Sequence, residues 1–208
     1  ADRFELKIIG QGGHAAKPHE AIDSIAVAGQ VITALQHIAS RCIDPLDTVV
    51  VTIGTIEGGY ASNVIAPEVR MSGTIRALSP DVRRRVPELL HRTIRGITDA
   101  FGASYELIVE DGYPPVINNE AMVAHFIDAN ERLFGEPRWE YARASTGGED
   151  FAYFAQQISG GFFRLGVNNG SAETSYPLHH PKFNLDESAL PLGTAMLAAL
   201  AVHYLEKA

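Results

Sequence analysis

The sequence predicts a mixed fold of the α+β and α/β classes, in two domains over residues 1–112 and 113–208. Strand-like and helix-like hydrophobic periods follow one another in the order β-α-β-β-α-β up to residue 112, which is the ferredoxin-like plan. A segment with two prolines, GYPPVINN, comes next and is typical of a linker. After it, fewer strands alternate with helices, which indicates part of an α/β layer.

The first half of the ferredoxin-like domain contains two strands and one helix. Residues 3–10, RFELKIIG, alternate as a strand does. The loop QGGHAAKPH follows, and we expect Pro18 to start a helix. Apolar residues then recur at helical spacing over residues 21–39 and predict one long amphipathic helix. Residues 48–56, TVVVTIGTI, are rich in β-branched side chains and predict the second strand.

The second half repeats the pattern with two strands and one helix. Residues 68–78, EVRMSGTIRAL, alternate as a strand. Ser79 and Pro80 are suited to the N-cap and first position of a helix, and Gly102 to its end. Residues 104–113, SYELIVEDGY, predict the last strand.

The remaining residues predict about half of a sheet with its helices. Residues 120–134 and about 186–207 have helical spacing, and TGGEDFAYFAQQI reads as a turn that enters a short helix. Two strands are expected, at residues 138–143 (RWEYAR) and, buried, at residues 160–167 (GGFFRLGV).

Composition excludes several classes of partner. A net charge of -8 argues against nucleic acid and anionic membranes, which need clustered Lys and Arg. No apolar stretch is expected to approach the roughly 20 residues that span a bilayer. The single cysteine, Cys42, excludes an internal disulfide and fits a reducing compartment, so we expect a cytoplasmic protein. Because the chain opens without Met on strand-like residues, we expect it to start inside a larger protein.

Candidate chemistry is confined to polar residues in loops stiffened by glycine or proline, since HExxH, P-loop, GxSxG and dinucleotide motifs are absent from the sequence. His14 follows Gly12 and Gly13. Such a histidine can donate to an oxyanion or bind a metal, although a solvated loop histidine is commoner. Asn63 can supply a neutral donor and Arg76 can fork onto a carboxylate; a turn asparagine and a surface ion pair are the alternatives.

Two further pairs are ambiguous on the residues alone. Glu149 and Asp150 fall at a helix start, where acidic residues are favoured electrostatically whether or not they have a role in a site. His179 and His180 lie in YPLHHPKFNLDE, where flanking prolines provide the rigidity that a metal site needs. In an extended segment their side chains point to opposite sides, so one is the candidate ligand and the other a neighbour or a solvated residue.

Four blocks, taken in order, resemble the zinc-dependent amidohydrolases and peptidases that include hippurate hydrolase, N-acyl-amino-acid amidohydrolase and carboxypeptidase G. They are GQGGHAAKPH, SNVIAPEVRMSGTIR, GGEDFAYF and LHHPKF, and together they cover essentially the whole chain. The resemblance implies that residues 1–112 form a lid domain that mediates homodimerisation. It implies that residues 113–208 are the C-terminal segment of the catalytic α/β domain.

The resemblance also assigns roles to residues. It selects His179 over His180 as a ligand of a divalent metal, expected to be Zn, with Mn, Co or Ni as alternatives. It implies that His14 reaches the neighbouring subunit's active site and stabilises the oxyanion there. Asn63 and Arg76 would bind the substrate, with Arg76 on its free carboxylate.

The resemblance is incomplete in one respect. The family's Cys-Gly-His-Asp segment, a further histidine and the Glu-Glu pair with the general base lie before the lid, and nothing in this chain matches them. Cys42, inside the lid, cannot replace them. We therefore expect a metal site that is incomplete in this chain, and no turnover by this chain alone.

The resulting hypothesis is part of a metal-dependent amidohydrolase that cleaves the amide bond of hippurate-like N-acyl amino acids. Its partners would be a small N-acyl amino acid or peptide substrate and a second copy of the chain. One alternative is a dipeptidase or carboxypeptidase of the same clan. The other is a non-catalytic dimerisation or binding module, which would dimerise without holding metal.

Overall fold

The computed structural model describes residues 1–207, and these form two compact units. The first unit comprises Ala1–Pro115 together with Ala144–Ala152. The second comprises Val116–Arg143 and the residues from Tyr153 onward. The division of the chain into a lid domain, residues 1–112, and a catalytic segment, residues 113–208, stays a prediction.

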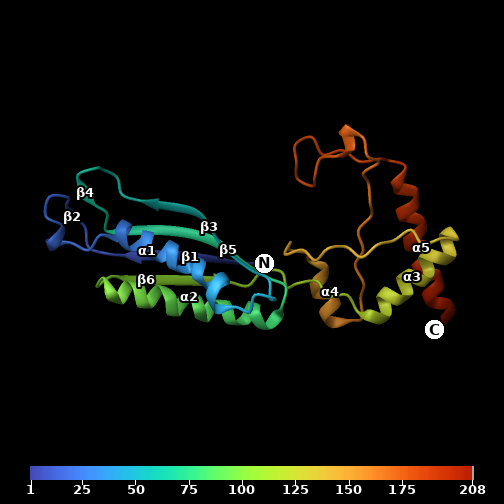
Figure 1. Cartoon of the computed structure of the whole chain (residues 1–208), viewed down its shortest axis with the longest axis horizontal. Helices are drawn as coiled ribbons and strands as arrows, with labels where there is room; N and C mark the ends of the chain where they lie inside the picture. Colours follow the sequence, from blue (N-terminus) through green and yellow to red (C-terminus); the bar gives the residue numbers. More distant parts are fainter. Residues whose placement is uncertain (208) are drawn as a thin grey trace. The chain divides into compact units, whose positions relative to one another are not determined.

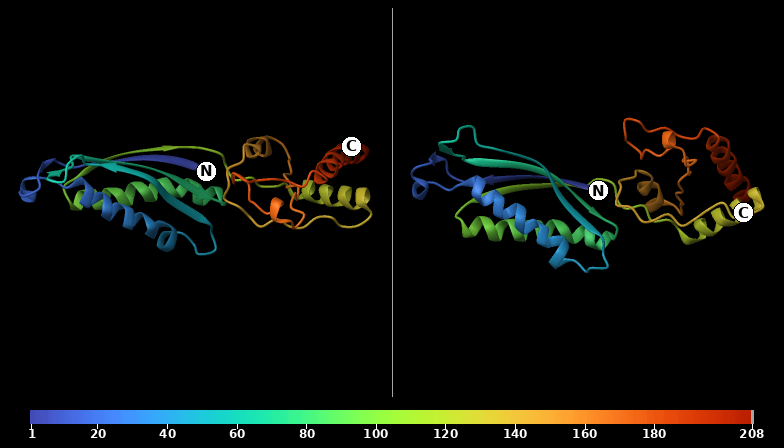
Figure 2. Two further views of the ribbon diagram at one scale, coloured as in Figure 1. Left: turned by 90° about the horizontal axis from the view of Figure 1, so that it is seen from above. Right: turned by 45° about the horizontal axis from the view of Figure 1, so that its top comes forward.

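The first unit is built on a four-stranded antiparallel sheet (Figure 1). Its strands, in the spatial order β3-β5-β1-β6, are β3 (Val49–Gly58), β5 (Glu68–Ala77), β1 (Asp2–Ile9) and β6 (Ser104–Glu110). Helices α1 (Ser24–His37) and α2 (Pro80–Ala100) cover one face of this sheet (Figure 2). The predicted ferredoxin-like β-α-β-β-α-β order of elements is therefore confirmed, with two further short strands in the loops.

The core of the first unit lies between the sheet and these two helices. Alternate residues of β1, namely Phe4, Leu6 and Ile8, are almost fully buried, as the period of two requires. They pack in one cluster with buried residues such as Leu35 of α1 and Leu90 of α2. Burial of this apolar surface is the main force that holds the unit together.

Helix α1 begins later than the sequence predicts. Pro18 starts only a single 3-10 turn, Pro18–Glu20, because Ile22 is held extended by paired backbone hydrogen bonds with Gln11. The helix can begin only after this bridge, and Asp23 caps it by accepting from the backbone N–H groups of the second and third helical residues. After His37 the chain continues in a π-helical turn, Ile38–Cys42.

The predicted ends of α2 are confirmed. The Ser79 hydroxyl accepts a hydrogen bond from the backbone nitrogen of Val82, and Pro80 is the first helical residue. Gly102 ends the helix region with a φ of 69°, a conformation that glycine adopts without strain.

The second unit contains helices α3 (Glu120–Phe134) and α5 (Ala189–Lys207), and the short α4 (Phe151–Gln157) begins at its boundary with the first unit. His203 of α5 contacts Asp128 of α3 at 2.7 Å, so the two helices pack against each other. The prediction of strands at residues 138–143 and 160–167 is wrong, because neither segment is a strand in the structure. A strand needs a neighbour for its backbone groups, and the described part of the second unit contains none.

Helix α5 also corrects the expectation about apolar length. It has 19 residues, and its most apolar window has a mean hydropathy of 1.3, so by length and composition alone it could cross a membrane. One such helix is weak evidence, and it does not by itself indicate a membrane protein. Only 22% of that window is buried within the chain.

Candidate functional site

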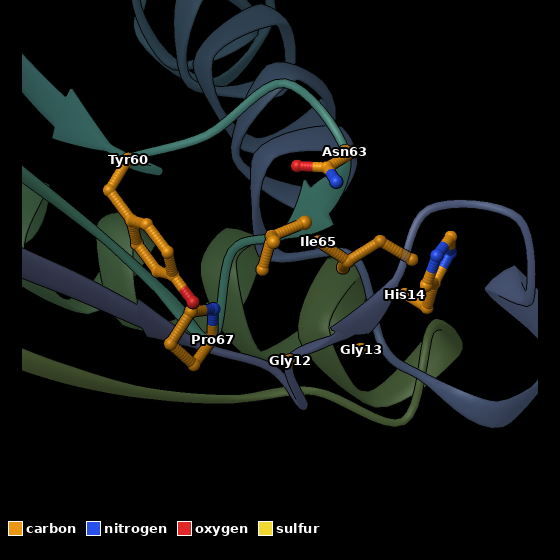
Figure 3. A pocket seen from close by; sticks show the side chains of 8 residues that line it. Gly12, Gly13, His14, Tyr60, Asn63, Ile65 and Pro67 are labelled. Carbon is orange, nitrogen blue, oxygen red and sulfur yellow. The ribbon is translucent and has the colours of Figure 1, made fainter.

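A cavity of about 400 Å³ lies at one end of the first unit, in the loops beyond β1 and before β5 (Figure 3). Two of the predicted site residues, His14 and Asn63, lie in its wall. The complete lining is Gly12, Gly13, His14, Tyr60, Asn63, Val64, Ile65 and Pro67.

A short antiparallel ladder brings His14 and Asn63 together. Strand β2 (Gly13–His14) pairs with β4 (Val64–Ile65), and the backbone nitrogen of Ala15 donates to the carbonyl of Asn63 at 3.1 Å. A Cβ on Gly13 would stand 2.9 Å from the Cβ of Ala21, so no larger residue fits there without a shift. The adjacent glycines thus allow the close approach that builds this end of the unit.

The ring of His14 is oriented by a hydrogen bond to its own loop. Its Nδ1 accepts from the backbone nitrogen of Ala16 at 3.0 Å. A backbone N–H can only donate, so the proton of the neutral imidazole lies on Nε2. His14 therefore offers an N–H donor from an exposed ring.

Asn63 offers a second donor beside it. Its side chain is exposed and makes no hydrogen bond with the residues that the structure describes. The amide is thus free to donate to a ligand oxygen in the same cavity as the His14 ring.

Arg76 lies at the opposite end of the sheet from this cavity. It stands eight residues beyond Glu68, the first residue of β5, which at about 3.4 Å per residue is roughly 27 Å. Its Nη1 donates to the carbonyl of Thr146 at 3.2 Å, in the segment Ala144–Ala152 of the same unit. The structure does not bring Arg76 together with His14 and Asn63 within one chain.

Glu149 and Asp150 lie in that same segment, directly before α4. The Glu149 carboxylate accepts from the backbone nitrogen of Phe151 at 3.4 Å, which is a capping contact at the helix start. Of the two interpretations left open by the sequence, capping accounts for the position of Glu149. Asp150 is exposed at the turn.

The segment around His179 is a turn, so the expectation of an extended segment is wrong. The backbone nitrogen of His180 donates to the carbonyl of Pro177 at 3.1 Å and closes the turn. His179 has a φ of 67°, and among the described residues it is the one non-glycine residue with a positive φ. The residue before a proline is disfavoured in the helical region, and Pro181 follows His180, so the turn falls on Leu178 and His179.

Contacts distinguish the two histidines in this turn. The His180 ring stacks on Tyr176 with centroids 4.5 Å apart, and its Nδ1 accepts from the backbone nitrogen of Lys182 at 3.0 Å. His179 is exposed and makes no hydrogen bond with any described side chain. The ring of His179 is therefore the one available to a ligand.

A metal would find only part of a site in this chain. Within residues 1–207, no group of three or more His, Cys, Asp or Glu side chains could hold a metal ion. The exposed imidazole of His179 is a suitable single ligand, and three or more ligands are needed. Cys42 lies in the π-helical turn after α1.

Sequence reasoning missed Tyr60 and Tyr176. Tyr60 lines the cavity, and Tyr176 supports the ring of His180. The available signal for Tyr60 was an aromatic residue placed directly after two glycines in a loop, where a large ring has no core to join.

Comparison with known proteins gives consistent matches along the chain. The profile of Peptidase family M20/M25/M40 matches residues 9–203. N-acetylcysteine deacetylase of Bacillus subtilis is 40% identical over 205 residues, which are 99% of this chain and 52% of that protein. IAA-amino acid hydrolase ILR1-like 4 of Arabidopsis thaliana is 35% identical over 97% of this chain and 47% of its own length.

A solved structure shows the same fold. The YXEP protein of Bacillus subtilis, described as a dinuclear metal binding peptidase, superposes with a TM-score of 0.80 at 36% identity. The match covers 99% of this chain and 50% of that one. The chain thus spans about half the length of the relatives that it matches.

Proposed function

This chain belongs to Peptidase family M20/M25/M40, and we propose that it is the lid domain and C-terminal catalytic segment of a metal-dependent amidohydrolase acting on N-acyl amino acids. The activity is proposed for the whole protein of which these residues are a part. The relatives named as an N-acetylcysteine deacetylase and an IAA-amino acid hydrolase support an acyl group joined to an amino acid as substrate.

The observation that carries the proposal is the pair of donors in the cavity. Hydrolysis of an amide passes through a tetrahedral intermediate whose oxygen becomes negative. Donors already in place stabilise that charge without reorganisation. The Nε2–H of His14, fixed by the bond from Ala16, and the amide of Asn63 are such donors in one wall.

The metal is proposed to be Zn, with Mn, Co or Ni as alternatives. His179 would hold it through one imidazole nitrogen, and the remaining ligands and the general base would come from outside these residues. A bound divalent ion polarises the amide carbonyl and lowers the pKa of water. The similarity of this chain to the YXEP protein, a dinuclear metal binding peptidase, supports a metal centre.

Arg76 is proposed to bind the free carboxylate of the substrate, because its guanidinium can form two parallel hydrogen bonds with it. Roughly 27 Å of strand β5 separate it from the cavity, and an N-acyl amino acid is far shorter. His14 and Arg76 of one chain therefore serve two different substrate molecules. A homodimer resolves this, with His14 and Asn63 of one subunit completing the site that contains Arg76 of the other.

The surface proposed for this dimer is formed by β3 and α1. Strand β3 is an edge of the sheet, and its residues Val49–Ile56 carry no charge. Helix α1 contains no Asp, Glu, Lys or Arg, and its exposed Gly29 meets no atom within 4 Å of an added Cβ. The opposite edge, β6, carries Glu106 and Glu110. An uncharged open edge is the one suited to pair with a second copy about a two-fold axis.

The direct test is an assay of the full-length enzyme on benzoyl-glycine and acetyl-amino acids, loaded in turn with Zn, Mn, Co and Ni. We expect metal-dependent hydrolysis, and a fall in kcat of about 10²–10³ in His14→Ala. Preference for dipeptides would instead favour the dipeptidase or carboxypeptidase alternative. Dimerisation without bound metal and without turnover of either substrate class would contradict the proposal and favour a binding module.

A further inference from the structure

Tyr60 is a large aromatic side chain left 81% exposed beside the candidate site. It lies in the loop between β3 and β4 and lines the same cavity as His14 and Asn63. In the view of Figure 3, Tyr60 and His14 stand on opposite sides of the cavity, with Asn63 and Ile65 between them.

The turn that contains Tyr60 packs closely against strand β5 of the first unit. A Cβ on Gly58 would stand 2.7 Å from Cγ2 of Val69 in β5, and Gly59 has a φ of 77°. Two glycines are thus required for the chain to pass here, and they hold Tyr60 at the rim of the cavity. The Tyr60 ring is hardly buried, so packing within the chain does not explain why a tyrosine stands at this position.

The cavity is divided by chemistry. Its donors, His14 and Asn63, share the lining with the Tyr60 ring and the apolar side chains of Ile65 and Pro67, and Figure 3 shows Tyr60 on the side away from His14. A ligand that fits both sides has an oxygen acceptor attached to a flat or extended apolar group. The acyl half of an N-acyl amino acid has this form, since its carbonyl oxygen is bonded directly to the carbon that bears the acyl chain.

We propose that Tyr60 determines the acyl-group preference of the enzyme, by forming the wall on which the acyl chain of the substrate packs. This rests on the proposed function, in which His14 receives the carbonyl oxygen. The carboxylate end of the same substrate is held by Arg76 of the other subunit, so the acyl end is the one that remains on the Tyr60 side. The ring favours aromatic acyl groups such as benzoyl over acetyl, which is too small to reach it.

The experiment compares kcat/KM for benzoyl-glycine and acetyl-glycine in the full-length metal-loaded enzyme. We expect Tyr60→Ala to lower the benzoyl-to-acetyl ratio about tenfold, which is the scale of one lost apolar contact in a specificity pocket. Tyr60→Phe keeps the ring and should keep the ratio. Leu46→Ala is the matched control, because Leu46 is 95% exposed in the same unit but precedes the far end of β3.

Two results would overturn the assignment. An unchanged benzoyl-to-acetyl ratio in Tyr60→Ala, including an equal fall for both substrates, would mean that the ring does not contact the acyl group. A changed ratio between benzoyl-glycine and benzoyl-leucine in Tyr60→Ala would place Tyr60 at the amino-acid side chain instead. If the wild-type enzyme hydrolyses none of these substrates, the proposed function fails as well. If the wild-type enzyme hydrolyses them and Tyr60→Ala leaves the benzoyl-to-acetyl ratio unaltered, only the assignment of Tyr60 fails.

Discussion

His179 holds a backbone conformation that costs a non-glycine residue on the order of 1–3 kcal/mol. Contacts of the next residue stabilise this conformation, because His180 is fixed by its stacking on Tyr176 and by the hydrogen bond from Lys182. Strain of this kind persists where the surrounding structure over-determines it, and it gathers at functional sites. It presents the His179 ring to solvent as an available ligand.

The first prediction separates the two histidines. We expect His179→Ala to lower the metal content of the full-length enzyme sharply and to abolish hydrolysis, because a ligand is lost. His180→Ala is the matched control and should retain bound metal, since its Nδ1 accepts from the backbone nitrogen of Lys182, which leaves the proton of the neutral ring on Nε2. Elemental analysis after desalting gives the answer, and a His179→Ala enzyme with full metal content and undiminished activity would refute the ligand assignment.

A second residue-scale prediction concerns Asp2. Its carboxylate accepts from Arg83 Nε at 2.8 Å and from the backbone nitrogen of Gly112 at 2.9 Å. Burial favours the neutral carboxyl, but these hydrogen bonds favour the carboxylate more, so the pKa of Asp2 lies below its usual 3.8. A lowered folded-state pKa gives stability that is present above pH 3.8 and is lost as the pH falls towards the folded value.

We therefore expect Asp2→Asn to lower the free energy of unfolding by about 3 kcal/mol at neutral pH, because the ion pair between the buried Asp2 and Arg83 is lost. The difference from wild type should shrink as the pH falls below 3.8. Urea unfolding of both proteins over a pH series measures it. A difference that stays constant at all pH values would contradict the pairing.

At this scale the sequence could indicate which residues are candidates for a site, but it could not predict which residues surround them. The residues of the four blocks indicated His14, Asn63, Arg76 and His179, and the structure leaves their roles as predictions. The ladder of β2 and β4 that joins His14 to Asn63 has only two residues in each strand, too short for any periodic signal. The turn at His179 was missed because a positive φ is uncommon at any non-glycine residue, although histidine adopts it more often than most.

At the scale of elements, helices with clear caps were predictable. Glu120–Phe134 was predicted at its observed bounds, and its Asn119 cap and αL Gly135 are the usual signals. The strands at residues 138–143 and 160–167 were not, because a strand exists only with a partner and periodicity carries no information about partners. The same limit applies to α1, whose start is set by the distant bridge between Gln11 and Ile22.

The third prediction tests the uncharged edge strand. We expect lysine at Val50 and Ile56 of β3, which are 38% and 54% exposed, to convert a dimer into monomers, since like charges would meet across a two-fold axis. Ile108→Lys on β6, at a site 57% exposed, is the control and should leave the dimer intact. Analytical ultracentrifugation at micromolar concentration distinguishes the species. A dimer that survives the β3 changes would move the interface elsewhere.

At the scale of the whole molecule, we propose that the two ends of the first unit have different roles. The backbone nitrogen of Ala1 donates to the carbonyl of Tyr113, so these two residues lie at the same end of the unit. Arg76 lies near that end, and the cavity with His14, Asn63 and Tyr60 lies at the other. A site that needs both ends is complete only when a second copy supplies one of them.

Subunit complementation tests this central claim most directly. His14→Ala and His179→Ala full-length enzymes should each be inactive, because every site in either dimer lacks one histidine. In mixed dimers formed by refolding the two together, one site of the two combines an intact His179 with the partner's intact His14. The account predicts recovery of about a quarter of wild-type activity, the share of such sites in a random mixture of two-fold dimers. No recovery, in mixtures shown to contain mixed dimers, would mean that both histidines act within one chain and would contradict the account.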